Sequence, residues 1–270
     1  MKRVTKILGV LSLAALLGAG TVYATPSTHV WAPSTDIQAY GVAHITSDIY
    51  VPVKKLDIID LEGTEDDGVD DRPGTITNLG LTVGVLPHEK IGLEVGFDHI
   101  EGQYPLYLNA KVGVPEGAYG ELFPAIAVGA YSIGTKTGGD NTVDPTKPGT
   151  DYNILYAKAA KTIGNFGRVS AGFYTGNEKL LVDEKAKSSE NGILLCWERT
   201  LSEVSENLWV AIDYMGGESS VGALSYGFAW KFAPNTAVIF GYVDQTNDNV
   251  LPGDTFTMQV DIDFDVFKKK

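Results

Sequence analysis

The chain has few of the residues that disulfide scaffolds and many enzymes require. Its 270 residues include one cysteine, Cys196, and four histidines. A single cysteine cannot form an internal disulfide, which excludes a disulfide-stabilised fold. We interpret Cys196 as a small strand residue rather than a reactive thiol, because free cysteine usually packs like a small apolar side chain.

Basic residues are also scarce. The chain has 21 Lys and Arg against 34 Asp and Glu, a net charge of −13. Three of the basic residues lie within the first 24, so the rest of the chain carries 18 basic against 34 acidic residues. Binding to a phosphate backbone needs a basic surface, and the charge balance therefore excludes nucleic acid as a partner.

Only one long apolar run is present, the fourteen residues "ILGVLSLAALLGAG" after Lys2, Arg3 and Lys6. A membrane-spanning helix needs roughly 17–25 residues, so the alternative of a membrane anchor is disfavoured. A basic start, a short apolar run and small residues at Val22 and Ala24 predict a signal peptide, residues 1–24, and export of the remainder.

A two-residue alternation is what the sequence does have. In "TFTMQVDIDF", residues 255–264, every second residue is apolar and the others are polar, which predicts a strand with two different faces. Similar stretches, including "VAHITSDIYVPV", "IGLEVGFD" and "LYLNAKVGV", bring the total to twelve. For "AIAVGAYSIG", "DYNILYAKAAK" and "AVIFGYV" the sequence does not fix which face is which.

The connections between these strands differ in length on alternate sides. Modest turns such as "PHEK" and "APNT" follow the even-numbered strands, whereas longer polar pieces such as "TKTGGDNTVDPTKPGT" follow several odd-numbered ones. An even strand count with short turns at one end and long loops at the other is typical of a transmembrane barrel. The apolar strand faces would then meet lipid.

Over nearly all of its length after residue 24, the chain resembles the outer-membrane β-barrel (porin-like) proteins of Gram-negative bacteria. The resemblance implies an all-β, antiparallel up-and-down barrel of about 12 strands, in the outer membrane, in contact with its lipid. It also implies insertion by the barrel-assembly machinery, whose signal is a final amphipathic strand ending in an aromatic residue, and Phe264 matches that position.

The expected organisation follows from these patterns. Residues 41–264 form the barrel, and "DVFKKK", residues 265–270, is a basic periplasmic tail. Residues 25–40 show no strand pattern, and two alternatives are open for them: a periplasmic lead or a plug inside the lumen. The sequence does not predict the oligomeric state.

Enzymatic activity is not expected. Barrel enzymes of this membrane include a phospholipase with a Ser–His pair and omptin-type proteases with acidic and His residues at the rim. His99 is the best-placed histidine, but "FDHIEGQ" has no Ser two residues after it, and Asp98 faces the opposite way. A base without a nucleophile or an orienting partner does not make a catalytic site, so we predict no catalytic residues and no cofactor.

The segment 54–74 is strongly acidic. Clustered carboxylates can bind Ca²⁺, but the glycine and acid positions do not follow the EF-hand spacing. The sequence favours a solvated acidic loop, with a weak divalent-cation site as the alternative. The carboxylates of its stretch "DLEGTEDDGVDDR" are Asp60, Glu62, Glu65, Asp66, Asp67, Asp70 and Asp71.

The inward face of the predicted strands is where we expect function. Seven carboxylates and three basic groups share this face, which predicts a passive channel for small solutes that prefers cations. Glu94 and Asp98 have the clearest strand phase and should matter most, and inward glycines such as Gly92 and Gly113 should leave room for water. The alternative is a non-conducting structural or surface-interaction barrel whose function lies in its loops. The ten charged residues are Asp48, Glu94, Asp98, Lys111, Arg168, Glu198, Asp213, Lys231, Asp261 and Asp263.

Overall fold

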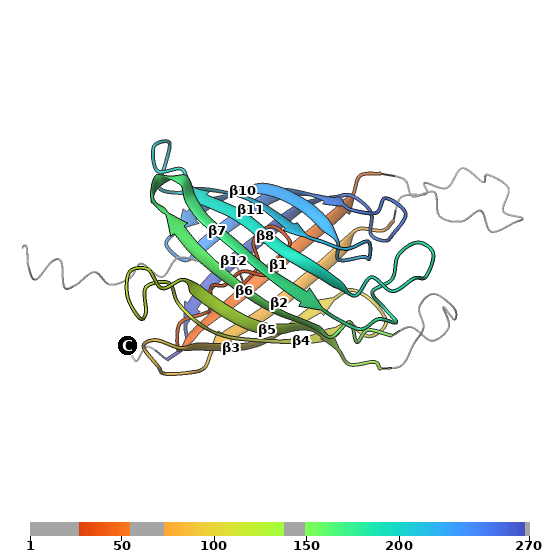
Figure 1. Cartoon of the computed structure of the whole chain (residues 1–270), viewed down its shortest axis with the longest axis horizontal. Coiled ribbons are helices and arrows are strands. Elements are labelled where there is room, and N and C mark those ends of the chain that lie inside the picture. Colours follow the sequence, from red (N-terminus) through yellow and green to blue (C-terminus); the bar gives the residue numbers. More distant parts are fainter. Residues whose placement is uncertain (1–26, 55–72, 138–148, 268–270) are drawn as a thin grey trace, which may run out of the picture.

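The computed structural model describes residues 27–54, 73–137 and 149–267, and these form a closed barrel (Figure 1). Each strand pairs antiparallel with its neighbours in sequence, and β1 pairs with β12 to close the ring. The predicted up-and-down barrel of 12 strands is confirmed. The strands are β1 (Val42–Pro52), β2 (Ile76–Gly84), β3 (Gly92–Ile100), β4 (Leu106–Val114), β5 (Ala125–Gly134), β6 (Ile154–Ile163), β7 (Gly167–Thr175), β8 (Asn191–Thr200), β9 (Leu208–Met215), β10 (Ala223–Ala233), β11 (Thr236–Gln245) and β12 (Thr255–Asp265).

Inward and outward side chains alternate along the strands, and the outward ones give the barrel an apolar outer surface. In β3, Val95 is 42% exposed and Phe97 is 38% exposed, whereas Glu94, next to Val95 in the strand, is 3% exposed. Strands of 8 to 11 residues are long enough to cross a bilayer when tilted. An apolar outer belt on a closed barrel needs lipid around it, which agrees with the predicted location in an outer membrane. Within the described ranges, no helix is long and apolar enough to cross a membrane.

The last strand lies in the frame that the sequence predicted. Phe264 pairs with Ala43 across the β1–β12 seam and is 44% exposed, while Asp261 and Asp263 are buried inside. Phe267 lies beyond β12 and packs against Tyr40, with 5.3 Å between ring centroids. The outward face of the strand therefore ends on Phe264.

The two ends of the barrel differ. One end carries the connections 85–91, 115–124, 164–166, 201–207 and 234–235, and β12 also ends there (Figure 1). The opposite end carries the connections 53–75, 101–105, 135–153, 176–190, 216–222 and 246–254. We call these the turn end and the loop end. A single short 3₁₀ helix among the described residues, Gly164–Phe166, makes the β6–β7 turn.

The structure fixes the facing of the strands that the sequence left open. Lys158 and Tyr156 of β6 are buried inside the barrel, as are Ile239 and Val243 of β11. Part of the interior is thus apolar, which explains why a strand such as β11 shows no clear polar face.

Some sequence predictions concern residues outside the described ranges. These are the signal peptide (1–24), residues 55–72 of the acidic segment, and the last three residues of the tail. Their predicted roles stay predictions.

A closed barrel makes a simple prediction about unfolding. Every backbone edge is paired, so we expect the protein to resist SDS without heating and to migrate differently once boiled. Electrophoresis of heated and unheated membrane fractions checks this. Identical migration together with recovery in the soluble fraction would contradict a membrane barrel.

Candidate functional site in the barrel lumen

Residues 27–40, which we call the lumen segment, lie inside the barrel. The segment reaches the turn end just before β1, where the Gly41 amide donates to the carbonyl of Gly84 at 2.9 Å. Further in it forms a tight hairpin, in which the His29 amide donates to the Ala32 carbonyl at 2.8 Å. Val30 and Ala32 at this hairpin are fully buried.

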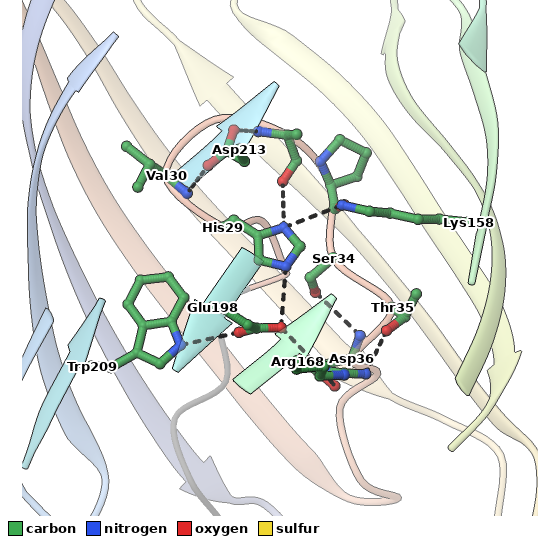
Figure 2. A network of polar contacts seen from close by, with 12 residues as sticks. His29, Val30, Ser34, Thr35, Asp36, Lys158, Arg168, Glu198, Trp209 and Asp213 are labelled. Carbon is green, nitrogen blue, oxygen red and sulfur yellow. Dashed lines mark hydrogen bonds and ion pairs between the residues drawn. The ribbon is translucent and has the colours of Figure 1, made fainter. Parts of the chain in front are cut away.

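One carboxylate on β9 holds the tip of the hairpin. Asp213 accepts hydrogen bonds from the amides of Val30 and Ala32, both at 2.8 Å, and from the amide of Trp31 at 3.3 Å. Successive backbone N–H groups that converge in this way form a concave anion site. Asp213, which the sequence placed in the lumen, therefore fastens the lumen segment to the wall, and Figure 2 shows two of these contacts.

His29 lies in a second polar network beneath the tip (Figure 2). Its Nε2 lies 3.3 Å from Oε1 of Glu198, whose other oxygen accepts from the Trp209 indole at 3.0 Å. Lys158 of β6 donates to the carbonyl of Pro33 at 2.9 Å. Charged wall residues from three strands thus contact one short piece of chain.

Arg168 and Glu94 hold the part of the segment that is nearer the turn end. The Arg168 guanidinium contacts both carboxylate oxygens of Asp36, at 2.8 and 2.9 Å, and lies 3.3 Å from Glu198. Glu94 pairs with Lys111 at 2.9 Å and accepts from the Gln38 amide at 2.7 Å. Lys111 also donates to the Asp36 carbonyl.

Two pairs of glycines on the wall make space for apolar side chains of the segment. A Cβ at Gly241 would lie 2.5 Å from Val30 Cγ1, and Gly227, which pairs with Gly241 across β10–β11, also faces Val30. Gly92 and Gly113 pair across β3–β4, and a Cβ on either would lie within 3 Å of Ile37. The expectation that inward glycines leave room for water is wrong at Gly92 and Gly113, because Ile37 occupies that space.

The ten charged residues predicted for the lumen all lie on the inner side of the wall, but they do different things. Asp213, Glu198, Arg168, Glu94 and Lys111 contact the lumen segment. His44 lies between Asp261 and Asp263, at 3.2 and 2.8 Å, and Lys231 lines the lumen near the turn end.

The remaining two carboxylates, Asp48 and Asp98, contact only neutral donors in the described part of the chain. The Asn78 amide donates to both at 3.1 Å, Thr46 donates to Asp48 at 2.6 Å, and Asn109 donates to Asp98 at 2.8 Å. Glu94, expected to share the dominant role with Asp98, is neutralised by Lys111 instead. The described residues include no group of three or more His, Cys, Asp or Glu arranged to hold a metal ion.

Two cavities lie beside the lumen segment. One, of about 970 Å³, is lined by turn-end residues such as Asn165 and Glu203. The other, of about 730 Å³, reaches loop-end residues such as Leu251. Thr28, an exposed residue of the segment, and Asp261 of β12 line both cavities. These two residues therefore border both cavities, between the turn end and the loop end.

Comparisons with known proteins give only distant likenesses. No family model matches the chain, and no curated protein matches its sequence. An outer-membrane channel from Pseudomonas putida F1 is 12% identical with a TM-score of 0.49, and the match covers 86% of this chain and 98% of that one. OmpF of Salmonella typhi is 9% identical with a TM-score of 0.40, covering 83% and 97%. OprB of Pseudomonas putida is 9% identical with a TM-score of 0.33, covering 83% and 93%. Similarity this low carries no argument about the function of this chain.

Proposed function

We propose that this protein is a passive channel for small solutes across the outer membrane and that it prefers cations. The observation that carries the proposal is the pair of lumen cavities, which open toward opposite ends and share Thr28 and Asp261. A solute that moves from one cavity to the other would pass the Asp261 carboxylate, which lines both. Twelve strands give a lumen between that of a packed small barrel and that of an open porin.

The charges along this route favour cations. Asp48 and Asp98 face the loop-end cavity without a basic partner among the described residues, whereas Glu94 has Lys111. In a narrow lumen with low-dielectric walls, unneutralised carboxylates focus the field and enrich cations. Screening limits the range of this field to roughly 8 Å at physiological salt, which still matters in a narrow lumen.

The alternative function, a non-conducting structural or surface-interaction barrel, is favoured by one observation. The lumen segment is held by buried polar contacts from several strands, so it could close the route completely. Planar-bilayer recording separates the two functions, because only a channel gives discrete conductance steps.

Charge neutralisation tests the cation preference. We expect the variant Asp48→Asn with Asp98→Asn to lower the K⁺ over Cl⁻ permeability ratio at least about twofold, because it removes two carboxylates that line the loop-end cavity and contact no basic side chain among the described residues. The measurement is the reversal potential across a KCl gradient. Glu203→Gln is the matched control, since its carboxylate lines the other cavity and already pairs with Arg199 at 2.8 Å. Anion preference in the parent protein, or an unchanged ratio in the double variant, would contradict the proposal.

A further inference from the structure

The loop-end cavity has a chemical character that neither a passive pore nor a structural barrel requires. Its walls combine aromatic rings with acidic and amide side chains. The aromatic residues that line it are Trp31, Tyr50, Tyr107, Tyr131, Tyr152 and Tyr156. At about 730 Å³, it lies within the usual size range of small-molecule sites.

The rings are held in place by contacts with each other. Tyr131 and Tyr156 meet edge to face with 5.9 Å between centroids, and Trp31 meets Tyr50 at 5.5 Å with an interplanar angle of 84°. The Trp31 indole also donates to the Val221 carbonyl at 2.9 Å. Aromatic faces carry negative partial charge and attract organic cations.

The polar side of the cavity offers acceptors for a cation. Among the described residues, four acidic side chains line the cavity: Asp48, Glu94, Asp98 and Asp261. Two basic side chains, His44 and Lys111, line it as well. His44 contacts Asp261 and Lys111 contacts Glu94, so Asp48 and Asp98 remain with neutral donors. Asn78 gives its amide hydrogens to both of these carboxylates, while its own Oδ1 has no partner. The carboxylates that line the cavity therefore outnumber its basic groups by four to two.

We propose that this cavity binds protonated primary amines that carry an apolar, preferably aromatic, body. The ammonium group supplies N–H donors and a positive charge to Asp48 and Asp98, and the body lies against the tyrosine rings. An inorganic cation would leave the rings unused, and a neutral alcohol would leave the carboxylates without a counter-charge. The inference deepens the proposed channel function, because it names a class of solute that the route would take up.

Calorimetry on the detergent-solubilised protein tests the inference, with phenethylammonium and its neutral analogue 2-phenylethanol as the probes. We expect phenethylammonium to bind at least about tenfold more tightly than 2-phenylethanol, since hydrogen bonds to charged groups are worth more than neutral ones. Asp48→Asn with Asp98→Asn should weaken phenethylammonium binding by a similar factor, and Tyr107→Leu should weaken it to a smaller degree. Glu203→Gln should leave binding unchanged. Each variant is first checked for a heat-dependent shift on SDS gels, which shows that its barrel is folded.

The outcomes separate this inference from the proposed function. Equal binding of the amine and the alcohol, or binding that survives loss of both carboxylates, would overturn the organic-cation site. Amine binding by a protein without conductance would support the site and overturn the channel. Cation-selective conductance without amine binding would support the channel and overturn the amine site.

Discussion

Deleting residues 27–38 should raise single-channel conductance at least about twofold, because conductance increases with the free cross-section of the narrowest part of the lumen. The deletion removes every residue of the hairpin but leaves all twelve strands intact. The barrel should therefore still close and still show a heat-dependent shift on SDS gels. Planar-bilayer recording of the deletion variant next to the parent protein measures the effect.

A full-length variant tests the same point without shortening the chain. Gly241→Val introduces a residue that favours strands, but its side chain must take the space of Val30 Cγ1. We therefore expect the lumen segment to be displaced from the wall. Conductance should rise toward that of the deletion. Asp213→Ala should act in the same direction, since it leaves the amides of Val30 and Ala32 without their acceptor. Glu178→Ala, on an exposed loop, is the control. Unchanged conductance in all three lumen variants would show that the segment does not limit the route.

Replacing Phe264 should impair assembly far more than replacing Phe267. Phe264→Asp puts a charge on the lipid side of the closing strand, at a cost of order 1–3 kcal/mol, and removes an aromatic at the position of the assembly signal. Phe267 lies outside the β1–β12 pairing, so Phe267→Asp loses mainly its contact with Tyr40. The measurement is the fraction of heat-modifiable barrel in the outer-membrane fraction. Equal losses in both variants would mean that assembly does not depend on an aromatic residue at the outward-facing position 264.

The barrel could be predicted from the sequence because each strand is marked by a pattern among neighbouring residues. Along β12, successive side chains point to opposite faces of the strand, and the polar residues alternate with the apolar ones. This alternation places Asp261 and Asp263 inside the barrel and Phe264 outside it. The same reasoning failed where both faces carry small or apolar residues, as in β11. There the inward residues Ile239 and Val243 are apolar because they pack in the cluster around Val30.

The location of the lumen segment was not decidable from the sequence. Its hydrogen bonds join residues far apart in the chain, such as Val30 to Asp213 across 183 positions and Gln259 to Val30 across 229 positions. The hydrophobic periodicity of a sequence does not predict contacts between residues this far apart. They form only when the barrel has closed around the segment. One signal was present in the sequence: inward apolar residues in a water-filled barrel need an apolar cover, and Val30 and Trp31 supply it.

The sequence by itself determined the strand number, the facing of most strands, the closing frame and ten of the charged residues on the inner wall, although it did not place Lys158. It did so because a period of two is a property of neighbouring residues. Only the tertiary structure decided which of these charges hold the segment and which stay without a basic partner. Glu94 and Asp98 are equivalent in their strand, yet one faces Lys111 and the other faces Asn78 and Asn109. That difference arises from the register between strands, which sets the partner of each inward side chain.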